Sequence, residues 1–577
     1  MSPFVPPKGV GRGDRVAARG LFLLLLALYT ATFSGTPDHL DSEAEFQTTS
    51  ALARRASFAV GGTAEGDAMV ARSEQAAAAG TNSGLPLVRG RDERWYSWFG
   101  TGQALFGVPL YVAGRAWSLA APAIEERHAQ RHWYGVPRSE YHAHVAVGWR
   151  NALLGALTAW LLFEAARRSG VGRRNAFLAA LAYGTTTFAW PQARSNLSDV
   201  QAGCALFAAY VMLLRVRERY RRLRRPKRPE LALFGASLGV AFLTRVLTAP
   251  AIAVLLVAFG CVVAAGRRRR AGELQRAPAP LLPLVAWALG PALVGMLLFL
   301  ALNAWRFGDP TESGYGAAVF SGSFFSNALH HGLAGILVSP GRGLLWLAPA
   351  LVCVPWGWME ARRRRELLWR WTSVGIVLAV FVPPALTHTW HGAWTFGPRY
   401  VLPALPFLWL GVALALERAR DHAPAKAGFL AVSALGLATN LSGVLVDHVT
   451  HQDLGMQALL GERAASYPDE FDAATIETDL FQRMQWEWSY AAPWAHWRIL
   501  RHRVARGSES FDAEELYGAP GLPALEPSQA RSRGFRHLWW VDRQELGGGF
   551  WWGAIGVGLL FALGLRWSAR GLDPAQR

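Results

Sequence analysis

Long apolar runs alternate with short basic segments along most of the chain. The clearest runs cover 249–265, 281–302 and 426–446. Each approaches the ~20 apolar residues that cross a hydrocarbon layer about 30 Å thick. A soluble core has no room for several helices that are apolar on every side. The pattern therefore predicts an all-α polytopic membrane protein.

Clusters of arginine beside the apolar runs indicate how the helices alternate across the membrane. Lys and Arg are concentrated in cytoplasmic loops, so we place every cluster in the cytoplasm and count the helices between clusters. The clusters are Arg167/Arg168, Arg173/Arg174, Arg215 to Arg228, Arg267–Arg270 and Arg362–Arg365. The count predicts about twelve transmembrane helices, in the range of about 11–13, with both termini cytoplasmic. They lie near 18–35, 143–165, 175–192, 199–215, 231–247, 249–265, 281–303, 341–358, 372–388, 400–417, 426–447 and 549–566.

The count leaves a long external loop at 36–142. Within it, the run 104–122 is almost long enough to cross the membrane, but it contains Pro109 and Arg115. We expect this run to be re-entrant or to lie along the outer membrane surface. Small and polar residues at 58–85 predict a mobile loop.

A second external segment covers 448–548 and has mixed charge. It contains Trp486, Trp488, Trp494, Trp497, Trp539 and Trp540. Because Trp is enriched where protein meets the membrane surface, we expect short amphipathic helices here without a large independent domain. The predicted organisation is a transmembrane region at 1–447, this external segment, and a last helix with a cytoplasmic tail at 549–577.

The composition agrees with a membrane protein and narrows its partners. The chain is 52% hydrophobic and only 17% charged, whereas soluble domains carry about 25% charged residues. A net charge of +18 could indicate nucleic-acid binding, but the basic residues lie beside the apolar runs. They indicate membrane topology and contact with anionic lipids, and no nucleic-acid partner is expected. The three cysteines form no CxxC pair, so neither disulfides nor a cysteine zinc site is expected.

Single arginines near the outer ends of the predicted helices are the first candidate chemistry. Arg342 and Arg399 stand among aromatic residues and glycines, and Arg245 comes about 21 Å along an apolar helix that starts near 231. A charge at that depth is expected to face a polar cavity. The guanidinium group binds phosphate oxygens through a forked donor, so these residues indicate a phosphate at the outer surface. The alternative is that the side chains reach lipid headgroups.

Acidic residues follow the first predicted helix directly. Asp41, Glu43 and Glu45 precede a stretch that favours helix. Acids at this position can simply stabilise the helix dipole. They can also supply a general base at the outer face of the membrane.

Several motifs, in order, resemble one family. They are Asp41-Ser42-Glu43, Trp95 to Gln103 (WYSWFGTGQ), Pro109-Leu110-Tyr111, Asn303 to Tyr315, Ser339 to Gly343, and Gly397 to Pro403. These motifs resemble the GT-C glycosyltransferases, which include the protein O-mannosyltransferases, the lipid A aminoarabinose transferase and related bacterial dolichyl-phosphate-mannose-type transferases. The resemblance covers most of 20–420 and none of the region after 450.

The resemblance implies a fold, a donor and a mechanism. The fold would be a GT-C-like helical bundle in the inner (plasma) membrane. A sugar on a polyprenyl phosphate would be transferred, with inversion, to a glycan, lipid or protein acceptor at the outer face. The implied base is Asp41, with Glu43 as the second choice. The implied phosphate-binding residues are Arg245, Arg342 and Arg399. Further substrate-binding residues by motif position are Tyr96, Gln103, His391 and Tyr400.

Two departures from the family pattern leave alternatives open. Trp98 stands where the motif carries Lys, and Asp41-Ser42-Glu43 lacks the adjacent Asp-Glu pair of several members. A transporter or flippase of lipid-linked sugars, or a non-catalytic relative, would also account for a helical chain of this kind. A divalent metal is compatible with the family, but His142, His144, His388 and His391 do not have the spacing of metal ligands. No cofactor and no metal ligand are therefore assigned.

Overall fold

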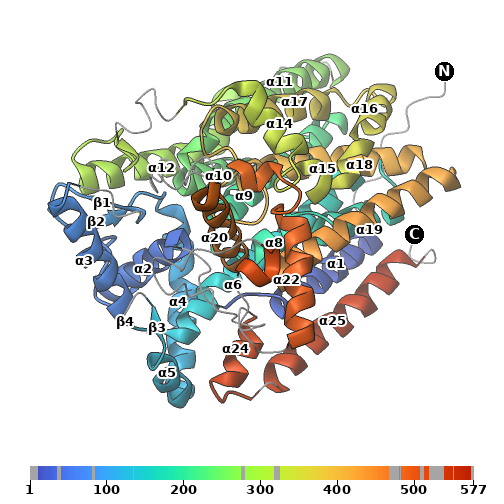
Figure 1. The fold of residues 1–577 in the computed structure, drawn as a ribbon. Coiled ribbons are helices and arrows are strands. Elements are labelled where there is room, and N and C mark those ends of the chain that lie inside the picture. Colours follow the sequence, from blue (N-terminus) through green and yellow to red (C-terminus); the bar gives the residue numbers. More distant parts are fainter. Residues whose placement is uncertain are drawn as a thin grey trace.

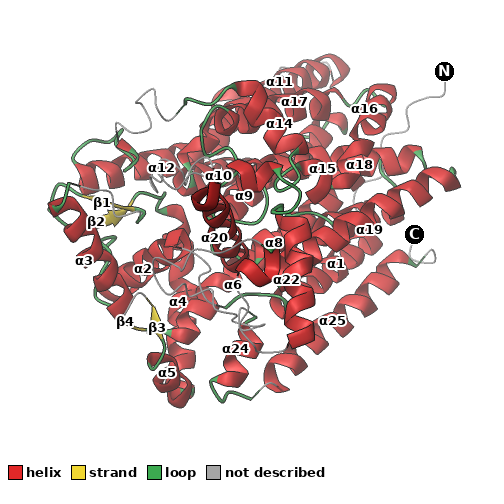
Figure 2. Cartoon of the chain, in the orientation of Figure 1, coloured by secondary structure: helices red, strands yellow, loops and turns green. Residues whose placement is uncertain are grey.

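The computed structural model is mostly helical (Figure 2). It describes residues 11–35, 40–80, 85–133, 136–274, 280–316, 325–466, 480, 482–506, 513–518, 538–549 and 551–573. Two small antiparallel sheets are the extended elements of the described chain.

Eight described helices are long and apolar enough to cross a membrane, which confirms the predicted class of all-α polytopic membrane protein. They are α6 (Tyr141–Arg168), α9 (Ser198–Arg221), α11 (Ala249–Leu274), α12 (Leu281–Phe307), α17 (Leu367–Ala385), α18 (Leu405–Arg418) together with the 3-10 helix that precedes it from Arg399, α19 (Ala423–Leu445) and α25 (Trp551–Leu572). The number rises to nine if α4 (Gly102–Ala120) and α5 (Pro122–Ala129), bent by 99°, form one span.

Shorter or less apolar helices occupy the other predicted spans. These are α1 (Arg12–Ala31), α7 (Arg173–Thr185), α10 (Arg228–Thr244), and a broken stretch made of α15 (Leu344–Leu347), η2 (Pro349–Cys353) and α16 (Val354–Arg363). Their length or composition does not by itself identify them as spans. The count of about twelve therefore stays a prediction.

The first and last helices, α1 and α25, lie side by side in opposite directions (Figure 1). Gly20 of α1 approaches Ser568, and Gly571 approaches Ala17. At the other end of α1, the backbone N–H of Trp539 donates to the carbonyl of Phe33 at 3.0 Å. The start of α1 and the end of α25 are therefore at the same face of the bundle. That both termini are cytoplasmic stays a prediction.

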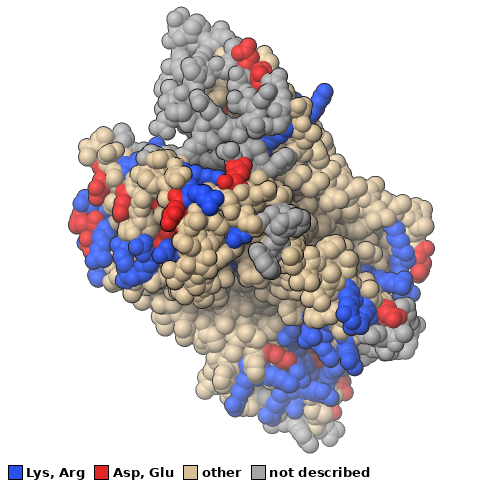
Figure 3. Space-filling view, turned by 90° about the horizontal axis from the view of Figure 1, so that it is seen from below, with Lys and Arg blue, Asp and Glu red and all other residues tan. Residues whose placement is uncertain are grey.

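Contacts between the arginine clusters bring the basic helix ends to one face. Arg173 donates to the Gly571 carbonyl at 2.8 Å, and Arg364 donates to the Gly170 carbonyl at 2.8 Å. Arg217 pairs with Glu366 at 2.6 Å. Figure 3 shows a broad uncharged surface between an area of mixed charge and an area that is mostly Lys and Arg. The clusters thus share one side, and its assignment to the cytoplasm stays a prediction.

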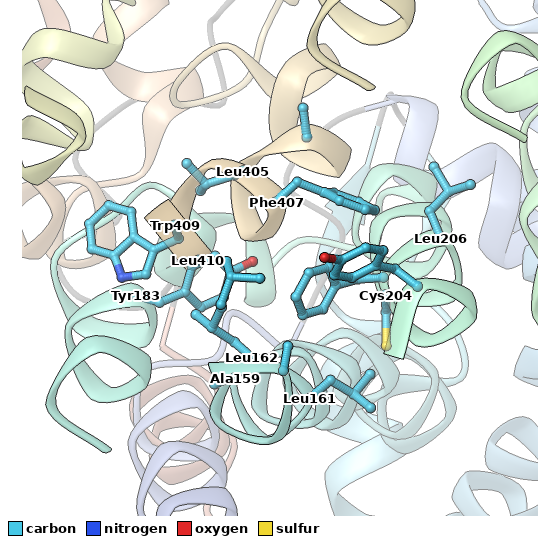
Figure 4. Close-up of a cluster of buried hydrophobic side chains, with 14 of the residues drawn as sticks. Ala159, Leu161, Leu162, Tyr183, Cys204, Leu206, Leu405, Phe407, Trp409 and Leu410 are labelled. Carbon is cyan, nitrogen blue, oxygen red and sulfur yellow. The ribbon is translucent and has the colours of Figure 1, made fainter. Parts of the chain in front are cut away.

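A buried core of α6, α7, α9 and α18 holds the bundle together (Figure 4). Phe407 of α18 packs edge-on against Phe207 with ring centroids 5.1 Å apart, and the indole N–H of Trp409 donates to the Ala179 carbonyl at 2.8 Å. Ala159 of α6 is fully buried in the same cluster. Small side chains let helix backbones approach closely, which favours packing inside a membrane.

The first external segment is more regular than its sequence predicts. It contains α2 (Leu40–Arg55), α3 (Ala64–Ala78), β1 (Leu87–Arg89) paired with β2 (Trp95–Ser97), α4, α5, and β3 (His132–Trp133) paired with β4 (Val136–Pro137). The prediction of a mobile loop at 58–85 is wrong, because α3 occupies its centre. Thr63 caps α3 by accepting from the N–H of Gly66 at 3.0 Å, and the alanines of α3 favour helix.

The helix α4, which contains the ambiguous run 104–122, contacts the same face at both of its ends. Near its start, Gly100 and Gly102 approach Thr244 at the end of α10, and further along Gly114 approaches Ala143 at the start of α6. Both of those helix ends lie away from the basic clusters. This arrangement supports the prediction that 104–122 is re-entrant or lies along the surface, and the choice between the two stays open.

Helices make up most of the described part of the second external segment, and two of them are longer than the short helices that we expected. The helices are α20 (His448–Ser466), α22 (Ala492–Arg506), α23 (Ala513–Tyr517) and α24 (Trp539–Glu545). The rest of 448–548 lies outside the described residues. α22 packs against α19 and α20, and α20 packs against α23, so this segment covers one end of the bundle.

Candidate functional site

Asp41 and Arg399 form an ion pair that joins two distant parts of the sequence. Asp41 lies in the first turn of α2, directly after α1, and Arg399 begins the short helix η3 (Arg399–Ala404) that leads into α18. Nη1 of Arg399 donates to Oδ2 of Asp41 at 3.0 Å. The side chain of Arg399 is 8% exposed and that of Asp41 is 27% exposed. The carboxylate is therefore the member of the pair that other molecules can reach.

A second arginine, Arg245, contacts the same aromatic ring as Arg399. The guanidinium carbons of Arg245 and Arg399 each lie 5.0 Å from the ring centroid of Tyr400. Such cation–π contacts stabilise a cation beside the ring. Arg245, the residue that ends α10, also forms an ion pair with Asp199 in the first turn of α9. We call Asp41, Asp199, Arg245, Arg399 and Tyr400 the Asp41 cluster.

Two aromatic residues extend the Asp41 cluster. Burial raises the pKa of the Tyr315 hydroxyl, on which the charges of Arg245, Asp41 and Arg399 also act. The ring of Tyr315 stacks on Trp98 with centroids 5.8 Å apart and an angle of 22° between the planes. Trp98 is the position at which the family motif carries Lys. Three of the sequence motifs, those that contain Trp98, Tyr315 and Arg399, thus converge on one place.

The acidic residues that follow Asp41 on α2 have different environments. Glu43 accepts from the amide of Gln47 at 2.6 Å and lies 3.4 Å from Nε2 of His144. Burial acts to raise the pKa of Glu43, but the charge of His144 and hydrogen bonds outweigh it and lower the pKa below its ordinary value. Glu43 is only 1% exposed, so its carboxylate makes contacts within the protein and is not accessible to a substrate.

Glu45, and not Glu43, is coupled electrostatically to Asp41. Residues four apart share one face of a helix, whereas residues two apart do not. Burial raises the pKa of Glu45 to about 8, with Arg150 opposing the shift and the charge of Asp41 adding to it. Its Oε1 atom has no hydrogen-bond partner within the described part of the chain. At neutral pH Glu45 is therefore mostly a neutral acid, one helical turn from Asp41.

The guanidinium group of Arg342 donates all of its described hydrogen bonds to other residues of the protein and none to Asp41. Its Nε donates to Oε1 of Gln485 at 2.8 Å, and its two other nitrogens donate to the carbonyls of Gly397 at 3.2 Å and Ala393 at 2.7 Å. The side chain is fully buried. His391, also buried, accepts from the N–H of Ala393 at 3.1 Å. Both residues support the loop that carries Arg399, and neither presents a polar atom beside Asp41 in the contacts described.

Tyr96 and Gln103 make contacts away from the cluster. The hydroxyl of Tyr96 donates to Asp92 at 2.8 Å, and its ring packs against Trp305 and Phe307. The side-chain amide of Gln103 donates to the carbonyl of Asn196. Of the predicted site residues, the structure brings together Asp41, Arg245, Arg399 and Tyr400. Glu43, Tyr96, Gln103, Arg342 and His391 make other contacts.

Asp199 and Tyr315 were not among the predicted site residues, and Glu45 was named only as one of three acids that follow the first helix. Asp199 is an acid in the first turn of a helix, which the helix dipole alone would explain. The sequence did indicate a signal for Glu45, because its spacing from Asp41 places both on one face of α2.

A cavity among the described residues lies away from the Asp41 cluster. Its volume is about 410 Å³, and it is lined by Arg168, Arg215, Glu218, Arg219, Arg222, Arg224 and Glu230. These residues stand at the basic end of α9, about 30 Å along that helix from Asp199. A small cavity of about 10 Å³ borders His144 and Arg194.

Residues 134–305 match the sequence model of the dolichyl-phosphate-mannose-protein mannosyltransferase family. Among solved structures, the chain is similar to ArnT from Cupriavidus metallidurans bound to undecaprenyl phosphate, with 15% identity and a TM-score of 0.43 over 96% of this chain and 76% of that chain. It is also similar to the archaeal oligosaccharyltransferase AglB from Archaeoglobus fulgidus in complex with an inhibitory peptide and a dolichol-phosphate, with 10% identity and a TM-score of 0.40 over 80% of this chain and 59% of that chain. No curated protein matches the sequence at a significant level. The match of residues 134–305 to this family model confirms the glycosyltransferase class predicted from the motifs.

Proposed function

We propose that the protein transfers a sugar from a polyprenyl-phosphate donor to an acceptor hydroxyl at the outer face of the cell membrane, with inversion and with Asp41 as general base. The observation that carries this proposal is the Asp41–Arg399 ion pair beside Arg245 and Tyr400. The basic helix ends then face the cytoplasm, and the Asp41 cluster faces outward. The family name supports the choice of a sugar on a lipid phosphate as donor.

The two arginines suit the phosphate of such a donor. Arg399 is nearly buried, and its Nε–H has no hydrogen-bond partner among the described residues. A buried guanidinium donor without a partner is well suited to an incoming phosphate oxygen. Arg245 also lies 5.0 Å from the centroid of the Tyr400 ring and adds a second cation. Both cations would stabilise the negative charge that develops on the leaving phosphate.

Asp41 suits the role of base because it is held and yet accessible. Arg399 fixes one carboxylate oxygen at 3.0 Å, and 27% of the Asp41 side chain remains exposed. A donor phosphate that binds Arg399 competes with Asp41 for the same guanidinium group. Donor binding would therefore loosen the ion pair and leave the carboxylate free to accept the proton of the acceptor hydroxyl.

The test measures sugar transfer and donor binding separately, in membranes that contain the natural donor. Asp41→Asn is expected to lower the transfer rate by about 100-fold or more and to keep donor binding. Arg399→Ala is expected to weaken donor binding. The matched control for charge removal is Glu126→Gln, at an exposed acid on α5. Transfer by Asp41→Asn at the parent rate would exclude Asp41 as base, and unchanged donor binding by Arg399→Ala would reduce Arg399 to a structural cation.

A further inference from the structure

Three buried histidines from two helices of the second external segment lie together. His448 and His451 stand one turn apart on α20, and His496 belongs to α22. Their exposed fractions are 9%, 2% and 0%, respectively. One ring nitrogen from each residue can be chosen so that all three lie within 4.8 Å of one another. Neither the family motifs nor the Asp41 cluster accounts for this arrangement.

The spacing of two of these nitrogens suits a metal ion. Nδ1 of His448 lies 3.2 Å from Nε2 of His496. Two imidazole nitrogens on a tetrahedral zinc ion, each bonded at about 2.0–2.1 Å, lie about 3.3 Å apart. The packing of α20 on α22 therefore already holds one ligand pair at the required separation.

The surroundings of the other ring nitrogens agree with this use. Nδ1 of His496 faces the carbonyl of Ser442 at 3.2 Å; such a contact orients the opposite nitrogen of the ring toward a metal. Nδ1 of His451 has no hydrogen-bond partner in the described residues, which is unusual for a buried polar atom. Burial lowers the pKa of His451 to about 3 and lowers that of His496 as well. Neutral imidazole is the form that binds metals.

Two neighbouring charges, Arg342 and the buried Arg503, oppose a cation at this place. Nη2 of Arg342 lies 3.3 Å from Nε2 of His448 and 2.7 Å from the carbonyl of Ala393. If Nδ1 of His448 binds the metal, the ring proton belongs on Nε2, and the contact with Arg342 is lost. Arg342 keeps its bonds to Ala393, Gly397 and Gln485, so the cost is one hydrogen bond and some charge repulsion.

We propose that His448, His451 and His496 bind one divalent transition-metal ion, with zinc as the expected metal, and that this ion joins α20 to α22. Three imidazoles without a thiolate suit zinc and its neighbours in the first transition series. The ion would fasten the second external segment beside Gln485 and Arg342, which support the loop of Arg399. This proposal does not depend on the identity of the donor or on Asp41 acting as base.

The experiment uses the full-length protein in detergent. After zinc loading and removal of free metal, elemental analysis is expected to give about one zinc per chain for the parent and for the control His502→Ala, which alters another histidine of α22. His451→Ala is expected to retain no zinc above background. Cobalt added to metal-free parent should give the visible absorption of tetrahedral Co²⁺, which zinc then displaces.

A measurement on the parent alone tests the proposal even if a variant fails to fold. Chelation should lower the melting temperature of the parent, and zinc should restore it. The proposal is overturned if the parent retains no more zinc than His451→Ala, or if cobalt gives no tetrahedral spectrum with folded parent protein. It is likewise overturned if chelation and zinc leave the melting temperature of the parent unchanged.

Discussion

Replacing Glu45 by Gln should make the protein relatively more stable as the pH rises. Burial gives Glu45 a pKa of about 8 in the folded protein, against an ordinary value of 4.5. Between these values the folded protein keeps a proton that the unfolded chain has released. The free energy of unfolding therefore falls as the pH rises through this window. Glutamine has no such proton to lose.

The size of the effect follows from the width of the window. One pKa unit corresponds to about 1.4 kcal/mol. The burial of Glu45 therefore costs about 3 kcal/mol at pH 7 and about 5 kcal/mol above pH 8, relative to a carboxyl with the ordinary pKa. Below about pH 4.5 this cost disappears, because both states are protonated. The quantity to compare is the change with pH, since Gln also introduces an amide group at a buried position.

Thermal melts in detergent from about pH 5 to about pH 9 test this reasoning. The melting temperature of Glu45→Gln minus that of the parent should increase across the series. Glu43→Gln is the matched control on the same helix, because His144 holds the pKa of Glu43 below its ordinary value. Its removal should destabilise the protein throughout the series. A constant difference between Glu45→Gln and the parent at every pH would refute the assigned environment of Glu45.

Two further predictions concern packing and topology. Gly235→Ala in α10 should lower the melting temperature, because its new methyl group would overlap the Ala288 carbonyl of α12 and cost ~1–3 kcal/mol. The control Gly260→Ala should be neutral or stabilising, because its methyl group meets nothing within 4 Å. Equal melting temperatures for the two variants would contradict the close approach of α10 and α12. A topology reporter inserted after residue 130 should read as external and one inserted after Arg269 as cytoplasmic, and a cytoplasmic signal at residue 130 would contradict the predicted arrangement of about twelve spans.

The sequence predicted the helical architecture because hydrophobic length and arginine clusters report directly on membrane crossing. It also selected Asp41, Arg245, Arg399 and Tyr400, since motifs and isolated external charges mark them. The mobile loop expected at 58–85 was wrong, because the small residues there are largely alanines, which favour the helix α3. Small size alone does not distinguish a loop from a helix.

Residues that act through tertiary contacts were harder to predict. Arg342 resembles Arg399 in its sequence surroundings. Its guanidinium group, however, donates to Gln485 and to backbone carbonyls far away in sequence. The partner of Arg245, Asp199, lies 46 residues away on another helix. The pairing of His448 with His496 depends on how α20 meets α22. None of these contacts leaves a local pattern in the chain.

The pairing of α1 with α25 has a consequence for biogenesis. Trp539 and Trp540, just before α25, donate from their indole rings to the carbonyls of Thr30 and Ala31 at the end of α1. Asp41 follows that end of α1 within one short connection. During synthesis the ribosome must therefore release α25 before the helix that precedes the acid acquires its final neighbours. An N-terminal fragment that stops before Trp539 would insert into the bilayer with its first helix unpaired on this side.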